Sequence, residues 1–162
     1  MERIVSTAYG LTMKLAIASD HAAFAFKQEL AAWLRGVGHD VADLGPESDA
    51  SVDYPDYGYI LADAVAQGEA ECGIALCGSG IGISIAVNRN PAVRCALVSE
   101  PFSASLARQH NDANVIALGA RLIGIEMAKA CIVAFLATDF LGGRHCGRVE
   151  KLGHPSLHGV PA

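Results

Sequence analysis

The 162-residue sequence has few aromatic residues, no long apolar run and no cluster of basic residues. Its most apolar stretch, residues 131–137, is far shorter than the roughly 18 residues of a membrane span, so no contact with a membrane is expected. The twelve Lys and Arg residues are scattered and the net charge is −5. This argues against nucleic acid as a partner, because a phosphate backbone requires clustered cations. A small phosphorylated ligand needs only two or three cations, so it is compatible with this charge distribution.

The sequence also lacks paired cysteines, a signal peptide and a recurring metal-ligand motif. The five cysteines form no C-x-x-C pair, and an odd number of thiols is typical of a reducing compartment. The N-terminus does not show the charged-then-apolar order of a signal peptide, so we expect a cytoplasmic protein. Four of the six histidines are widely spread, and the one closely spaced pair, His154 and His158, has no C-x-x-C or second histidine pair to complete a zinc site. We therefore expect neither a metal nor a cofactor.

What the chain does have is an alternation of short apolar runs and helical periodicity. Residues 1–12 show no periodicity and are interpreted as an extension, followed by a single domain over residues 13–162. Buried strands are predicted at residues 14–19, 39–44, 72–77, 94–99 and 115–118. Helices are predicted between them and after the last, with Asp56 capping the second and Pro101 in the first turn of the fourth. This alternation predicts an α/β fold whose parallel sheet is covered on both faces.

Ligands of such sheets bind beyond the carboxyl ends of the strands. A glycine-rich turn follows the third predicted strand, with Gly78, Gly80 and Gly82 at alternate positions. Its exposed N–H groups and the helix after it could bind a phosphate or stabilise an oxyanion. The turn could equally be a tight connection without a ligand. A dinucleotide-binding G-x-G-x-x-G motif is a further alternative, but Ile83 occupies the place of its third glycine.

Other reactive side chains also have a functional and a structural interpretation. Cys77 lies between a strand and a helix N-terminus, where a thiolate could act as a base or nucleophile, or where a thiol could simply fill the core. His110 could be a catalytic acid or only the cationic end of a helix. Arg144 and Arg148 lie one helical turn apart, which suits either a phosphate dianion or a solvated helix face.

Taken together and in order, seven motifs resemble the ribose-5-phosphate isomerase B family, which includes allose- and galactose-phosphate isomerases. The resemblance covers residues 13–151. The motifs are S-D-H (19–21), D-Y-P (53–55), C-G-S-G-I-G-I-S-I-A (77–86), S-E-P-F-S-A (99–104), R-Q-H-N-D (108–112), N-V-I-A-L-G-A-R (114–121) and G-G-R-H-C-G-R-V (142–149).

This resemblance implies a Rossmann-like three-layer α/β/α sandwich with a five-stranded parallel sheet. It implies metal-independent interconversion of ribose 5-phosphate and ribulose 5-phosphate through an enediolate. Cys77 matches the base that moves a proton between C1 and C2, and His110 matches the acid that opens the furanose ring. Some family members use a carboxylate further along the glycine loop instead of the cysteine. No Asp or Glu stands there in this chain, which leaves Cys77 as the candidate base.

The resemblance also implies a set of substrate contacts and an assembly. Members of the family form homodimers with active sites shared between subunits; assembly to a tetramer is left open. We expect the Cys77 loop of one chain to face His110, Asn111 and Arg121 of the other. The matching substrate-binding residues are Asp20, His21, Tyr54, Gly78, Ser79, Gly80, Ile81, Gly82, Asn111, Arg121, Arg144 and Arg148.

Two other functions stay open from the sequence. A hexose 6-phosphate, allose or galactose, is the alternative substrate within the family, because one sequence does not reveal the depth of a pocket. A non-catalytic module that binds a nucleotide or a phosphosugar is the alternative of another class. The presence of both Cys77 and His110 argues against this second alternative.

Overall fold

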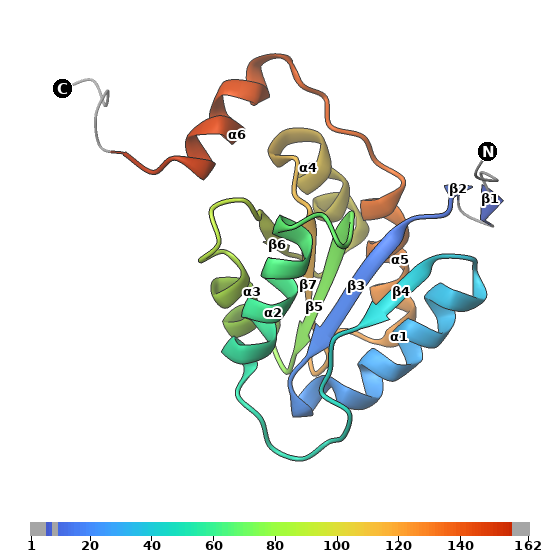
Figure 1. Cartoon of the computed structure of the whole chain (residues 1–162). Coiled ribbons are helices and arrows are strands. Elements are labelled where there is room, and N and C mark those ends of the chain that lie inside the picture. Colours follow the sequence, from blue (N-terminus) through green and yellow to red (C-terminus); the bar gives the residue numbers. More distant parts are fainter. Residues whose placement is uncertain (1–5, 8–9, 157–162) are drawn as a thin grey trace.

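The computed structural model describes residues 6–7 and 10–156 (Figure 1). Five parallel strands form the central sheet: β3 (Lys14–Ser19), β4 (Asp40–Asp43), β5 (Cys72–Cys77), β6 (Cys95–Leu97) and β7 (Val115–Gly119). Their order across the sheet is β4-β3-β5-β7-β6. The chain therefore builds outward from β3 to β4 and then crosses to the other side for β5. The direction in which strands are added to the sheet reverses between β3 and β5. Sheets of this type bind ligands at the carboxyl ends of the two strands at such a point.

Helices cover both faces of this sheet, as the alternation of strands and helices predicted. They are α1 (Phe24–Gly36), α2 (Tyr54–Ala66), α3 (Ile81–Val87), α4 (Pro101–Asn111) and α5 (Ile125–Leu136). One hydrophobic core joins α1, α4 and α5 to the sheet, and a second joins α2 and α3 to its other face. The predicted three-layer sandwich is confirmed.

Side chains alternate between these two cores along each strand. In β3, Leu15 and Ile17 face the core of α1, α4 and α5, whereas Ala16 and Ala18 face the core of α2 and α3. All four are almost fully buried, which explains why the strand reads as a continuous apolar run. The small alanine side chains also let α2 and α3 approach the sheet closely.

Two details differ from the sequence-based expectation. Helix α2 begins at Tyr54, two residues before the predicted cap Asp56, because Pro55 fits a first turn, where its missing N–H costs no hydrogen bond. The N-terminal extension contains a short antiparallel pair, β1 (Ser6–Thr7) with β2 (Gly10–Leu11), where no element was expected. Residues 1–5, 8–9 and 157–162 lie outside the described residues, so the expected single domain over 13–162 is described only as far as residue 156.

Near the end of its described part, the chain forms a short helical segment outside the two helical layers (Figure 1). It comprises the 3₁₀ turn η2 (Gly143–His145) and α6 (Cys146–Gly153), and it carries Arg144 and Arg148. A further 3₁₀ turn, η1 (His21–Ala23), leads from β3 into α1. Within the described residues, no helix has the length and apolarity needed to cross a bilayer.

Candidate active site

A cavity of about 390 Å³ lies at the carboxyl ends of β3 and β5. It is bordered by two turns that directly follow these strands, by the start of α2 and by the segment after β7. Its lining residues are Asp20, His21, Ala22, Tyr54, Cys77, Gly78, Ser79, Gly82, Arg121 and Leu122. Most of the residues predicted for the site therefore meet in one place, although they come from four separate segments.

Cys77 is the last residue of β5, and its side chain is almost fully buried at the base of this cavity. The N–H of Gly80 donates a hydrogen bond to Cys77 Sγ at 3.0 Å. Gly80 can do this because its φ of 77° is in the left-handed region, which glycine adopts without strain. A Cβ at Gly80 would also lie 2.9 Å from the carbonyl carbon of Leu118, so the turn requires glycine on two counts.

The other cysteines are set apart by burial or position. Burial raises the pKa of Cys72 and of Cys131 to about 11, and that of Cys95 to about 12, so these thiols stay protonated at neutral pH. Cys146 is exposed at the start of α6, away from the cavity. Cys77 is thus the one cysteine in the described chain that lines the cavity.

Asp20 and His21 also line the cavity. Asp20 Oδ1 accepts a hydrogen bond from the N–H of Ala23 at 3.2 Å, so Asp20 caps η1 and also lines the cavity. His21 Nδ1 lies 3.2 Å from the nitrogen and 3.1 Å from the oxygen of Val52, which fixes the orientation of the ring. The structural and functional interpretations of both residues are therefore compatible.

Tyr54 and Arg121 close the cavity above the glycine loop. A Cβ at Gly82 would lie 2.7 Å from the Tyr54 ring, and a Cβ at Gly78 would lie 3.4 Å from the Arg121 guanidinium. Arg121 is also tied to the loop through its N–H, which donates to the carbonyl of Gly78 at 2.9 Å. The expectation that Arg121 faces the Cys77 loop from the other subunit is therefore wrong: both belong to the same chain.

Two residues of the glycine loop that were predicted to bind substrate, Gly80 and Ile81, do not border this cavity. The N–H of Gly80 is used by Cys77 Sγ, and the N–H of Ile81 donates to Ser79 Oγ at 3.2 Å. The Ile81 side chain lines a neighbouring hollow of about 300 Å³ together with Leu97 and Leu122. The loop residues that border the cavity of about 390 Å³ are Cys77, Gly78, Ser79 and Gly82.

The remaining predicted residues do not reach this cavity within one chain. His110, in the last turn of α4, stacks on His145 with ring centroids 4.6 Å apart and an interplanar angle of 12°. Burial, followed by the positive charges of His110, Arg144 and Arg148, lowers the pKa of His145 below its ordinary 6.5. Asn111 borders a different cavity of about 440 Å³. The described chain thus carries two groups of predicted site residues at separate places.

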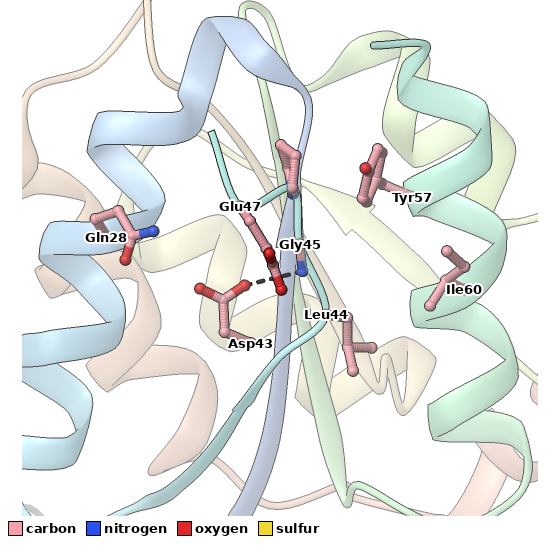
Figure 2. Close-up of a pocket in the computed structure, with 8 residues that line it drawn as sticks. Gln28, Asp43, Leu44, Gly45, Glu47, Tyr57 and Ile60 are labelled. Atoms are coloured by element: carbon pink, nitrogen blue, oxygen red, sulfur yellow. Dashed lines mark hydrogen bonds between the residues drawn. The ribbon is translucent and has the colours of Figure 1, made fainter. Parts of the chain in front are cut away.

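A further cavity of about 530 Å³ lies between α1 and α2, beside the segment that follows β4 (Figure 2). Gln28 faces Tyr57 and Ile60 across it, and Asp43 forms part of its wall (Figure 2). Asp43 binds Lys27, whose Nζ lies 2.6 Å from both carboxylate oxygens and 3.0 Å from the carbonyl of Pro46. Lys27 is fully buried, and its pairing gave no signal in the sequence because its partner is on another element.

Lys27→Met is expected to lower the free energy of unfolding by about 3 kcal/mol, because it leaves Asp43 without its counter-ion. Asp43 is 22% exposed, so water compensates part of the loss. Urea denaturation measures the effect, with Lys129→Met as control. Lys129 pairs with Glu126, which is 83% exposed, and its loss should cost at most about 1 kcal/mol. Equal stabilities of the two variants would contradict the assignment.

Sequence and structure comparisons relate the chain to known proteins. The sequence profile of the Ribose/Galactose Isomerase family matches residues 15–152. The chain is 47% identical over 139 residues to ribose-5-phosphate isomerase B of Escherichia coli (strain K12), covering 86% of this chain and 93% of the relative. It is 41% identical over 144 residues to D-erythrulose-4-phosphate isomerase of Pectobacterium atrosepticum, covering 88% and 94%.

Solved structures show the same fold. A ribose 5-phosphate isomerase of Thermotoga maritima superposes with a TM-score of 0.86 at 48% identity, covering 87% of this chain and 97% of the other. Ribose-5-phosphate isomerase B of Mycoplasma genitalium, solved with bound ribulose-5-phosphate, superposes with a TM-score of 0.81 at 38% identity, covering 85% and 92%. The chain therefore belongs to the ribose/galactose isomerase family, a family of aldose–ketose isomerases.

Proposed function

We propose that this enzyme interconverts ribose 5-phosphate and ribulose 5-phosphate in the cytoplasm. The observation that carries the proposal is the cavity in which the Cys77 thiol, the glycine loop, His21 and Arg121 converge. Isomerisation through an enediolate needs a base, donors for an oxyanion and an anchor for the phosphate, and this cavity contains a candidate for each. The five free cysteines support a reducing compartment.

In the proposed mechanism, the Cys77 thiolate takes the proton from C2 of the open-chain aldose and returns it to C1. The negative charge that develops on the C1 oxygen is stabilised by N–H groups of the loop, and the proton of the C2 hydroxyl passes to the C1 oxygen, so that C2 becomes the carbonyl carbon of the ketose. Because the N–H groups of Gly80 and Ile81 bind Cys77 and Ser79, we assign this role to Ser79 and Gly82. Arg121 and His21 bind the phosphate, and Asp20 and Tyr54 contact the sugar.

We further propose that a second copy of the chain completes the site. Ring opening needs an acid, and the candidate His110 lies apart from the cavity of its own chain, as do Arg144 and Arg148. Large apolar side chains that a partner could bury are exposed on α3, β6, α4 and the segment after β7: Ile81, Ile85, Leu97, Phe102 and Leu122. A homodimer would bury this surface and bring His110 with the two arginines to the partner's Cys77 loop.

A substrate panel tests the proposed reaction. Ribose 5-phosphate, allose 6-phosphate, galactose 6-phosphate and erythrose 4-phosphate are each incubated with the enzyme, and ketose formation is followed. We expect the highest kcat/KM with ribose 5-phosphate. A higher value for a hexose phosphate would reassign the substrate. Absence of turnover with every sugar, together with a thermal shift on adding a nucleotide, would indicate a binding module instead.

Metal independence is a separate prediction. No group of three His, Cys, Asp or Glu side chains is close enough to hold a metal ion anywhere in the described chain. Activity should therefore survive prolonged dialysis against EDTA, because proton transfer by Cys77 and charge stabilisation by N–H groups replace a Lewis acid. Rates before and after dialysis are compared. Loss of activity that a divalent ion restores would refute the prediction.

A further inference from the structure

The end of α4, directly after His110, has an unusual backbone conformation. Asp112 caps the helix with φ of 44° and ψ of 45°, and it is the only non-glycine residue with positive φ among residues 6–7 and 10–156. Residues with a Cβ avoid this left-handed region unless their surroundings hold them there. Such residues gather at functional sites, and this one lies two positions from the proposed ring-opening acid.

Two arginines hold Asp112 in place. Arg94 Nη2 lies 3.2 Å from Asp112 Oδ2, and Arg108 Nη1 lies 3.4 Å from Asp112 Oδ1, so each carboxylate oxygen has its own partner. Arg94 Nε also donates to the carbonyl oxygens of Asn111 at 3.2 Å and Asp112 at 2.8 Å. All three side chains are partly buried, which makes these contacts less screened than surface ion pairs.

Arg108 connects this helix end to the segment that carries His145. Its Nε donates to the carbonyl of Thr138 at 3.3 Å, and its guanidinium lies over the Phe135 ring at 5.4 Å. The N–H of Leu141 donates to the carbonyl of Gln109 at 3.1 Å. These contacts join the ends of α4 and α5 shortly before the 3₁₀ turn whose His145 stacks on His110.

We propose that Arg94, Arg108 and Asp112 are positioning residues for His110. They fix the left-handed end of α4 and its distance from the His145 turn, and so they hold the His110 ring stacked and aimed outward toward the substrate. None of the three borders the cavity of Cys77. This role rests on the proposed function, because it assigns these residues to the ring-opening step of that reaction.

The test uses a sugar that needs no ring opening. Erythrose 4-phosphate cannot form a furanose, because its O4 is phosphorylated, whereas ribose 5-phosphate is cyclic. Asp112→Gly removes the Cβ and the carboxylate, so the helix end loses its ties to Arg94 and Arg108 and is no longer fixed, while glycine can still adopt the left-handed conformation without strain. We expect kcat/KM for ribose 5-phosphate to fall about tenfold to a hundredfold, while the value for erythrose 4-phosphate changes less than about twofold. His110→Ala should show the same pattern, and the exposed loop variant Asp49→Gly should show neither loss.

A second measurement does not depend on activity. In the wild-type protein, the stacked rings of His110 and His145 should shift each other's ring-proton NMR signals upfield, and Asp112→Gly and Arg94→Met should both reduce this shift. Equal losses with the two sugars, or unchanged histidine signals in both variants, would overturn the proposal. If the wild-type protein does not isomerise the tetrose, the NMR signals alone decide. They would do so even if the protein proved to have a different substrate.

Discussion

Cys77→Ala is expected to lower kcat by about 10² to 10⁴, the usual cost of removing a general base. The Sγ atom is the candidate proton acceptor within the cavity, and it accepts a hydrogen bond from the Gly80 N–H at 3.0 Å. Because His21 and Arg121 remain in place, ribose 5-phosphate should still bind. Steady-state kinetics measure the loss, and isothermal titration calorimetry measures the retained affinity.

The control is Cys146→Ala, which removes an exposed thiol away from the cavity and should leave kcat unchanged. In that background iodoacetamide should inactivate the enzyme by alkylating Cys77, and substrate should protect it. The other three thiols are kept protonated by their raised pKa values and should react slowly. A Cys77→Ala enzyme with nearly wild-type turnover would remove Cys77 from the mechanism.

The sheet could be predicted because its signals are local. Residues 14–19 and 72–77 are apolar throughout, since helices cover both faces, and these ranges match β3 and β5. The edge strand β6 is shorter than the predicted range 94–99 and is confined to Cys95–Leu97. It pairs with a neighbour on one side only and is half-buried, so its apolar pattern says less about where its pairing ends.

That several of the candidate residues lie together around Cys77 could be predicted for the same reason. Asp20, His21 and the glycine loop directly follow strands, and parallel strands bring their carboxyl ends to one edge. Arg121 also follows a strand, but its side chain lies over Gly78 of the same chain and not across an interface. The direction of one side chain depends on tertiary packing, which no short motif specifies.

Pairs between distant segments gave no signal at all. The Lys27–Asp43 ion pair, the His110–His145 stack and the contacts of Asp112 each join residues on different elements or on either side of a helix end. A buried lysine in α1 looks like any surface lysine in the sequence. The motif R-Q-H-N-D did contain Arg108 and Asp112, so it pointed to the right segment without revealing that both act on the conformation after His110.

The separation of Cys77 from His110 within one chain leads to the second large effect. If each active site takes Cys77 from one subunit and His110 from the other, Cys77→Ala and His110→Ala homodimers should each be nearly inactive. When the two variants are unfolded and refolded together in equal amounts, about half of the dimers should be mixed. Each mixed dimer then contains one site with both lesions and one intact site, so the mixture should recover roughly a quarter of wild-type activity.

The distribution of residues between chains determines this outcome. Because Arg121 lies beside Cys77 of its own chain, an Arg121→Ala chain belongs to the same complementation group as a Cys77→Ala chain. Mixing these two variants should restore nothing, whereas mixing Arg121→Ala with His110→Ala should restore activity as Cys77→Ala does. Light scattering confirms that dimers form at the assay concentration. If Cys77→Ala with His110→Ala recovers no activity although mixed dimers are present, both residues serve the same site from one chain, and α4 must move to bring His110 to the cavity.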